Sequence, residues 1–359
     1  MGKADRSLHL HESDGINPYG RELLNVLSRG GMSGTASFPA DMEWVPDIGP
    51  DFAIRRVLPG NHPSAKWRQV LRLAHGMCLL VVAAARRNTI LISWTRTTVE
   101  DLLLCLLAGV GCDVISIAHN AELRGSPSRM RNRAYQRRMR TSARVVAHTP
   151  EALQQCLAHV GGNGNGHIAR HPLYLAWVEA FASSRKSSTG EVKRLVLLGA
   201  VRDDKGAVDI VRIMSLLPSS LREQVQLTFA GPGRLEPDTA KSLDNLGVRV
   251  LGPFDKFVTD KELGEILAEA DLCIAPYRRV TQSGSVMLAL SVGLPVLAFA
   301  TGGLIQTVSP QGLVPPDDME AFAKALNDAW PDLELGRLRE PRAVWLRESI
   351  REWDRALFG

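Results

Sequence analysis

The residues best suited to hold a phosphate lie late in the chain, where a polar turn opens a helix. The turn is Thr281-Gln282-Ser283-Gly284-Ser285, and an apolar helical run follows it over 286–292. The first turn of a helix presents unpaired N–H groups and the positive end of the helix dipole. Serine hydroxyls add donors, and Gly284 lets the backbone close on an anion. The pattern therefore predicts a phosphate site at this helix start.

Two cations follow an earlier strand of the same half. In LVLLGAVRDDKG, a predicted strand ends at Gly199, and a short loop carries Arg202 and Lys205 before a helix. Ligands of such sheets bind outside the carboxyl ends of parallel strands. A guanidinium offers a planar fork to phosphate oxygens, and an ammonium offers a point charge. A solvated loop in which Asp203 and Asp204 neutralise the cations explains the same residues equally well.

Two further strand ends carry turns that suit a nucleotide base. QLTFAGPG ends a strand in a turn with Gly231 and Gly233, which allow close backbone approach or simply a tight turn. LGPFDKFVTDKEL ends a strand at Gly252-Pro253. Its next helix starts at Thr259, where Glu262 completes a capping box. The backbone between that strand and that helix is a candidate lining for a base pocket.

Arginines crowd one segment of the first half. The segment Arg124–Arg144 contains eight arginines and no acidic residue. Among them, Arg131, Arg137 and Arg138 are candidates for an acceptor-binding or membrane-facing surface. Like charges on one helix repel, which disfavours a plain solvated face. A basic surface suits anionic lipid headgroups, a lipid diphosphate or an acidic glycan. Nucleic acid fits less well, because Tyr135 alone could stack on a base.

Composition is that of an ordinary globular protein. The chain has 359 residues, 45% hydrophobic and 23% charged, with a formal net charge of +5. Its five cysteines form no CxxC pair, which favours reduced thiols in a cytoplasmic protein. The N-terminus lacks the apolar core of a signal peptide. The longest apolar span, Met77–Ala85, is shorter than the ~20 residues that cross a bilayer.

Strands and helices alternate along most of the chain, which predicts parallel sheets with crossover helices. Predicted strands span 8–11, 89–93, 113–118, 144–147, 167–169, 194–198, 226–230, 248–251, 272–275 and 296–299. The polar stretch 183–190 reads as a linker. We expect an α/β fold of two doubly wound, Rossmann-like domains, 1–182 and 191–340, facing a central cleft. Helix 341–359 is expected to pack back on the first domain.

These pieces together resemble one known family. LGAVRDDKG, LTFAGPG, the stretch from VLGPFDKF to TQSGS, and LALSVGLPVLAFATGGL with GLVPPDD follow one another over about 120 residues. Their order resembles the nucleotide-sugar domain of GT-B glycosyltransferases, closest to family 4. The segment IAPY…TQSGSVMLALSVGLPV resembles the corresponding sequence of a subgroup that includes exopolysaccharide and lipid-linked mannosyltransferases.

The resemblance implies roles for the second half. Arg202 and Lys205 would hold the donor diphosphate together with the turn residues Ser283, Gly284 and Ser285. Nucleotide and sugar would be bordered by Gly231, Pro253, Phe254, Val258 and Gln282.

One departure from the family pattern bears on the donor. Family 4 commonly carries two glutamates with seven residues between them, one for the donor sugar and one for the ribose. Those positions are Val280 and Leu288 here. The sugar and ribose contacts must therefore differ from the common pattern.

The first half resembles the family more loosely. ISIAHNAEL places His119 after a central strand, as the family's HN turn does, where it would contact the transferred sugar or act as a base. A loop histidine paired with backbone is the alternative. The first loop carries Glu12 and Asp14 on the acceptor side, and either acid would suit an inverting base. Asn17 as N-cap with Pro18 at the first helical position explains the rest of that loop.

The implied activity is transfer of a hexose from a nucleoside diphosphate sugar to a hydroxyl of a glycan, lipid-linked or other acceptor, in a cytoplasmic and peripheral membrane enzyme. Mannose follows from the subgroup, while UDP- and dTDP-sugars stay open, as does retention or inversion. No Asp-x-Asp motif stands at a strand end, so we expect no metal and no cofactor. An inactive nucleotide-sugar sensor or partner subunit and a nucleotide-sugar epimerase are the alternatives.

Overall fold

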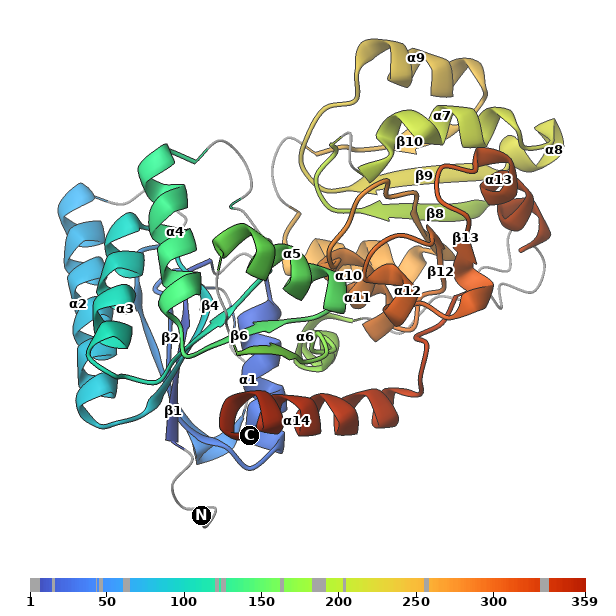
Figure 1. Cartoon of the computed structure of the whole chain (residues 1–359). Helices are drawn as coiled ribbons and strands as arrows, with labels where there is room; N and C mark the ends of the chain where they lie inside the picture. The colour runs from blue at the N-terminus through green and yellow to red at the C-terminus, as the bar shows by residue number, and fades with distance from the viewer. Residues whose placement is uncertain are drawn as a thin grey trace. The chain divides into compact units, whose positions relative to one another are not determined.

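The computed structural model describes residues 7–14, 17–42, 44, 48–60, 65–119, 123, 127–161, 165–182, 192–202, 205–254, 258–329 and 336–359. It divides into two compact units (Figure 1). Unit 1 holds 1–172 and 343–359, and unit 2 holds 173–342. The expected linker, 183–190, lies outside the described residues.

Unit 1 is built on a seven-stranded parallel sheet with the order β3-β2-β1-β4-β5-β6-β7. Its strands are β1 (Ser7–Glu12), β2 (Ser33–Pro39), β3 (Phe52–Leu58), β4 (Thr89–Trp94), β5 (Val114–Ile117), β6 (Arg144–Ala147) and β7 (Gly166–Ile168). Its helices are α1 (Tyr19–Arg29), α2 (Lys66–Ala85), α3 (Thr98–Gly109), α4 (Arg129–Thr141), α5 (Pro150–Val160) and α14 (Arg342–Phe358). The helices α2, α3 and α4 lie side by side (Figure 1).

Unit 2 is built on a six-stranded parallel sheet with the order β10-β9-β8-β11-β12-β13. Its strands are β8 (Lys193–Leu198), β9 (Val225–Ala230), β10 (Arg249–Leu251), β11 (Leu272–Ala275), β12 (Val296–Phe299) and β13 (Leu313–Val314). Its helices are α6 (Leu175–Phe181), α7 (Ala207–Ser215), α8 (Ser219–Arg222), α9 (Pro237–Asn245), α10 (Asp260–Glu269), α11 (Gly284–Ser291), α12 (Leu304–Thr307) and α13 (Met319–Asp328).

The helix before the expected linker, α6, packs in unit 2. The first unit therefore ends at residue 172, ten residues before the expected end at 182. The indole N–H of Trp177 on α6 donates to Asp260 Oδ1 at 2.8 Å. A Cβ on Gly264 of α10 would lie 2.2 Å from Phe181 O, so only glycine lets the two helices approach this closely. The C-terminal helix α14 packs in unit 1, where Trp353 is buried in the core with α1.

Two strands of unit 1 were not predicted. β2 (SGTASFP) begins with small and polar residues, and β3 (FAIRRVL) interrupts its apolar positions with Arg55-Arg56. Both strands carry too few consecutive apolar residues to give the signal of a buried strand. The apolar helix α2 is also longer than the span Met77–Ala85. At 20 residues, it is long and apolar enough to cross a membrane by length and composition alone.

Candidate active site

The loop between β8 and α7 is held against two neighbouring strand ends of unit 2. Gly199 N donates at 3.1 Å to the backbone oxygen of Ala230, the last residue of β9, and Val201 N donates at 3.0 Å to that of Pro232 in the turn that follows. At the other end of the loop, Gly206 has a φ of 72°. A Cβ there would lie 2.1 Å from the backbone oxygen of Pro276, which follows β11. Glycine is therefore required for this loop to close on the carboxyl edge of the sheet.

The start of α11 lies beside that loop. A Cβ on Gly199 would come 3.0 Å from Ser285 Oγ, so the end of β8 and the mouth of α11 are neighbours. Ser283 is buried, and its Oγ accepts from Val286 N at 3.3 Å as the helix cap. Gly284 and Ser285 are half-exposed. The structure thus uses the Ser283 side chain inside the helix start and leaves the next two residues open to a ligand.

The two predicted cations lie on this loop. Lys205 Nζ stands 3.6 Å from the centroid of the Tyr277 ring, and the Tyr277 hydroxyl donates to Leu198 O at 3.1 Å. The ammonium therefore sits over the ends of β8 and β11. Arg202 is exposed, and its carbonyl accepts from Lys205 N at 3.0 Å. Asp203 and Asp204 lie outside the described residues.

A third cation at this edge was not predicted. Arg278 follows β11 and is half-exposed, while its partner Asp209 on α7 is buried. Arg278 Nε donates to Asp209 Oδ2 at 2.7 Å, and Nη2 makes a second bond to the other oxygen. This bidentate ion pair joins the first turn of α7 to the loop before α11. The sequence signal was the cation directly after Pro276-Tyr277.

The expected base-binding residues flank the turn after β9. Phe254 N donates to Gly231 O at 3.0 Å, and Gly233 N donates to Phe254 O at 3.3 Å. The Phe254 side chain is 36% exposed, which leaves its ring open to stack on a planar group. Pro253 and Val258 are half-buried near it in sequence, and 255–257 lie outside the described residues. The Gln282 side chain folds back, accepting from Ser283 N at 3.3 Å.

The sheet of unit 1 places a buried acid at the end of β1. Glu12 Oε2 accepts from Ser93 Oγ at 2.5 Å, and Oε1 accepts from Asp14 N at 2.8 Å. A Cβ on Gly20 would fall 2.5 Å from Glu12 Oε2, so the first turn of α1 closes over the carboxyl group. Burial, and then the charge of Asp14, raise the pKa of Glu12 to about 8. Burial also raises the pKa of Asp14. At neutral pH, Glu12 is therefore mostly protonated.

Aromatic rings and histidines gather at the same edge. His119, after β5, lies 4.5 Å from Tyr19 and 5.0 Å from Trp94 between ring centroids. His148, after β6, lies 5.9 Å from His119 and 5.0 Å from His171. His119 is half-exposed, whereas His148 and His171 are buried. The edge thus offers rings of modest polarity around one half-exposed imidazole.

The tautomer of His148 follows from its backbone contact. Its Nδ1–H donates to Ala169 O at 2.7 Å, so Nε2 carries a lone pair. That Nε2 is buried and has no hydrogen-bond partner within the part of the chain that the structure describes. Burial lowers the pKa of His148 to about 4, and burial also lowers the pKa of His171. Both rings are therefore neutral at pH 7. Neither histidine is predicted as a site residue from the sequence, because His148 precedes Thr-Pro and His171 precedes Pro, and such turns are typical of structural positions.

A charged network lies deeper in unit 1. His11 Nε2 stands 3.0 Å from Glu100 Oε1, to which Ser13 Oγ donates at 2.6 Å. Burial alone would raise the pKa of Glu100, but the contacts with His11, Ser13 and Thr97 outweigh it and lower that pKa to about 2. The N-terminus of α3, where Thr97 and Glu100 form a capping box, is thereby fixed to β1.

The arginine surface expected on α4 is wrong for two of its three residues. Arg138 is 2% exposed, and it donates to Asp101 Oδ1 at 2.8 Å and to Ser116 Oγ. Arg131 is mostly buried, pairs with Asp101 through Nη1, and donates to Thr95 O at 2.7 Å. Asp101 on α3 compensates both charges, which is why these arginines face inward. Arg137 is exposed, as expected.

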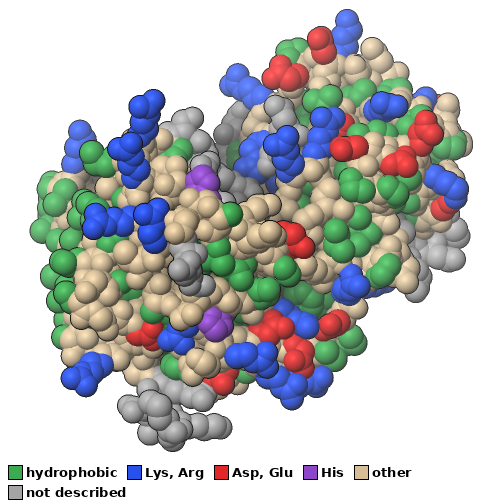
Figure 2. All heavy atoms as spheres, in the orientation of Figure 1, with side chains coloured by type: hydrophobic (Ala, Val, Ile, Leu, Met, Phe, Trp, Pro, Cys, Tyr) green, Lys and Arg blue, Asp and Glu red, His purple; other side chains and the backbone are tan. Residues whose placement is uncertain are grey.

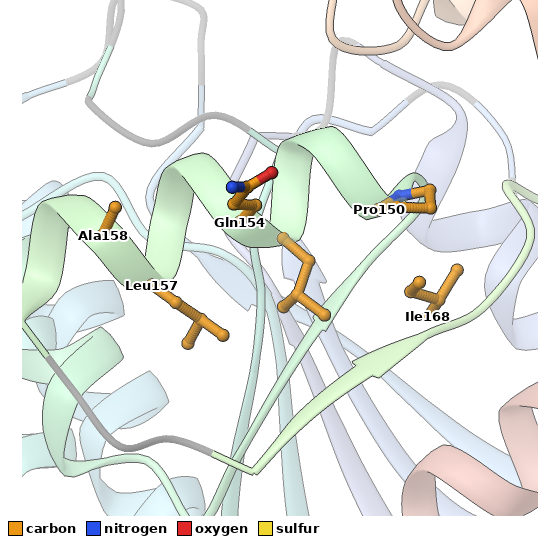
Figure 3. A pocket seen from close by; sticks show the side chains of 6 residues that line it. Pro150, Gln154, Leu157, Ala158 and Ile168 are labelled. Carbon is orange, nitrogen blue, oxygen red and sulfur yellow. The ribbon is translucent and has the colours of Figure 1, made fainter.

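A surface depression in unit 1 lies apart from the candidate site residues described above. A shallow depression of about 530 Å³ lies between α5 and β7, lined by Pro150, Leu153, Gln154, Leu157, Ala158 and Ile168 (Figure 3). Only Gln154 lends it a polar side chain, so it lacks the converging polar groups of a ligand site. Within the described ranges, no three His, Cys, Asp or Glu side chains are grouped to hold a metal.

Residues 192–332 match a family model described as Glycosyl transferases group 1. Over 151 residues, the chain is 26% identical to 2-deoxystreptamine N-acetyl-D-glucosaminyltransferase of Streptomyces fradiae. That alignment covers 41% of this chain and 36% of the relative, so the chain matches little more than a third of the relative's length.

Solved structures match nearly the whole chain. Sucrose-phosphate synthase of Thermosynechococcus elongatus superposes with a TM-score of 0.60 and 17% identity, covering 98% of this chain and 94% of that one. HepE of Anabaena in complex with UDP gives a TM-score of 0.60 and 14% identity, covering 98% and 95%. The predicted α/β fold is confirmed, while the likeness to mannosyltransferases stays a prediction. The chain has the GT-B fold of glycosyltransferases, and most of its second unit matches the group 1 glycosyl transferase family.

Proposed function

We propose that the protein transfers a sugar from a nucleoside diphosphate sugar to an acceptor hydroxyl. One observation carries the donor half of this proposal. The end of β8 at Gly199 and the start of α11 at Ser285 are neighbours, because a Cβ on Gly199 would lie 3.0 Å from Ser285 Oγ, and Lys205 is held over the same sheet edge. N–H groups at a helix start and a fixed cation stabilise the charge that a leaving diphosphate develops. The proposed transfer needs no metal for that purpose.

For the nucleoside, we propose uridine as the first candidate. The Anabaena neighbour is described in complex with UDP, with UDP and glucose, and with UDP-glucose. Other neighbours are described as UDP-forming trehalose-phosphate synthases. Phe254 beside the Gly231 turn would stack on the base. A GDP-mannose donor is the competing assignment from the sequence resemblance, and titration with UDP, GDP and dTDP separates the three.

For the acceptor, we propose the edge of unit 1 that carries His119. Its half-exposed ring is placed by Tyr19 and Trp94 and can accept or donate at a substrate hydroxyl. Glu12 suits a hydrogen-bond donor better than a base, because its raised pKa keeps it protonated at neutral pH. If inversion requires a base, His119 is therefore the stronger choice over Glu12 and Asp14. The anomeric configuration of the first-formed product, read by proton NMR, decides between inversion and retention.

The test combines binding and turnover. The wild type should bind UDP and release it from a UDP-sugar in the presence of a pooled glycan acceptor. Replacing Arg202 and Lys205 together by Ala should lower kcat by about 10²–10³. Arg234→Ala, an exposed cation beyond the turn after β9, is the matched control and should leave kcat unchanged. Near-normal turnover in the double variant would contradict the proposal.

A nucleotide-sugar sensor is the second candidate, favoured by one observation. Val280 and Leu288 occupy the positions of the family's two glutamates, and Leu288 is buried in α11. A protein that binds a UDP-sugar tightly but neither transfers nor hydrolyses it would fit the sensor. Interconversion of donor sugars without any acceptor would instead identify an epimerase.

A further inference from the structure

An apolar surface covers the outer side of two helices in unit 1. The exposed apolar side chains are Trp67, Val70, Leu71, Val81 and Val82 on α2, Val99, Leu102 and Leu106 on α3, and Val110 directly after α3. We call this set the α2–α3 patch. On α2 the positions recur every three or four residues, with exposed Ala74 and Cys78 between them, so they form one continuous stripe. Figure 2 shows hydrophobic side chains gathered along this side of unit 1.

The patch is unusual for a helix that already has an inner face. Gly76, Leu80 and Ala83 are the buried residues of α2. A Cβ on Gly76 would lie 2.3 Å from Leu58 Cδ2, so α2 is fitted closely to β3. The outer face of such a helix is ordinarily polar. Here Trp67 is 60% exposed and Leu106 is 64% exposed. Contiguous exposed apolar surface of this kind marks an interaction site.

The exposed charges on α2 and directly after it are all positive. Lys66 and Arg68 are exposed in the first turn of α2, and Arg86 and Arg87 are exposed directly after its end. The sequence of α2 contains no acid. The two acids of α3 are buried and bind inward, Glu100 to His11 and Asp101 to the arginines of α4.

The neighbouring helix extends the basic rim. Exposed arginines of α4, which packs beside α3, are Arg129, Arg133, Arg137 and Arg140. An apolar stripe with a cationic rim matches the interface of an anionic bilayer, where acyl chains lie beneath negative headgroups. A second copy of the chain fits less well, because pairing two such patches would bring their cationic rims together.

We propose that unit 1 docks on an anionic membrane surface through the α2–α3 patch. The axis of α2 lies in the plane of the interface, its apolar stripe enters the upper acyl region, and Trp67 sits at headgroup level. The inner side of α2 stays packed on the sheet, so the helix does not cross the bilayer. The expected membrane surface thereby moves from the arginines of α4 to α2 and α3, with α4 as its basic margin. This inference stands on surface chemistry and is independent of the proposed transfer reaction.

The first test is flotation of the full chain with lipid vesicles. We expect binding to phosphatidylcholine vesicles with about 30% phosphatidylglycerol, weaker binding to pure phosphatidylcholine, and partial loss at about 0.5 M NaCl. Leu71→Glu with Leu106→Glu should weaken binding about 100-fold, since each buried apolar side chain contributes roughly tenfold. Leu216→Glu is the control, because Leu216 is an exposed apolar residue of unit 2. Matching melting temperatures show that the variants fold.

The second test reports from within the patch. Cys78 is exposed on the stripe, and Cys112 is partly exposed. For selective labelling of Cys78, Cys112 is first replaced by Ser. An environment-sensitive fluorophore on Cys78 should shift to the blue when anionic vesicles are added, and a lipid-borne quencher should dim it.

Four results would overturn the inference. The first is an absence of vesicle binding. The second is binding that the Leu71→Glu, Leu106→Glu variant retains in full. The third is a dimer in light scattering that the same variant converts to a monomer, which would assign the patch to a second copy. Resistance of the vesicle-bound chain to alkaline carbonate would instead show a spanning helix and would also contradict surface docking.

Discussion

Replacing Glu12 by Gln should change how the stability of the protein depends on pH. The folded protein holds the Glu12 carboxyl at a pKa of about 8, against an ordinary value of 4.5 in the unfolded chain. Between these values the folded state binds one proton more than the unfolded state, so stability falls as pH rises. One such proton contributes a slope of about 1.4 kcal/mol per pH unit. Glutamine keeps the shape and the hydrogen-bonding reach but does not titrate.

The measurement is urea unfolding of both proteins at several pH values between about 5 and 8. The free energy of unfolding of the wild type, minus that of Glu12→Gln, should fall by roughly 1–1.4 kcal/mol per unit across this window. Coupling to Asp14 shares the titration and lowers the slope somewhat. A difference between wild type and Glu12→Gln that stays constant with pH would refute the reasoning.

Other substitutions test the packing and the base site. Arg138→Met should lower the free energy of unfolding, measured by urea titration, by about 3–5 kcal/mol, because it removes a partner of the buried Asp101. Arg137→Met, at an exposed arginine of the same helix, should change that free energy by less than about 0.5 kcal/mol. Phe254→Ala should weaken UDP binding by about 1–3 kcal/mol in calorimetry if the ring stacks on the base, and unchanged affinity would remove that role. Gly206→Ala should lower the free energy of unfolding by about 1–3 kcal/mol, because the Gly206 backbone is left-handed and a Cβ there would meet the backbone oxygen of Pro276. An unchanged melting temperature would contradict the close packing of the loop between β8 and α7 against Pro276.

The fold could be predicted where apolar runs mark buried strands. The strand TILISW of β4 and the run VISI of β5 lie inside a parallel sheet, covered on both faces, and their sequences show it. β2 and β3 were missed because small residues and Arg55-Arg56 hide their pattern. The compact units divide after residue 172, and the sequence alone does not show this, because the contact of Trp177 with Asp260 joins residues 83 positions apart.

Candidate site residues could be predicted where function leaves a local pattern. Glycine, serine and cation positions after β8 and before α11 are visible in the sequence because turns and helix starts are local. The partners of a charged side chain are not local. Arg138 looks like a surface cation until Asp101, on another helix, is seen to compensate it. The lone pair of His148 likewise depends on a backbone oxygen 21 residues away.

The proposed transfer depends on a donor diphosphate that binds where α11 begins. A crystal structure of the protein with UDP tests it most directly. We expect phosphate oxygens about 3 Å from the backbone nitrogens of Gly284 and Ser285, with the Lys205 ammonium turned toward them. A nucleotide bound elsewhere, with the mouth of α11 empty or filled by the protein's own side chains, would contradict it.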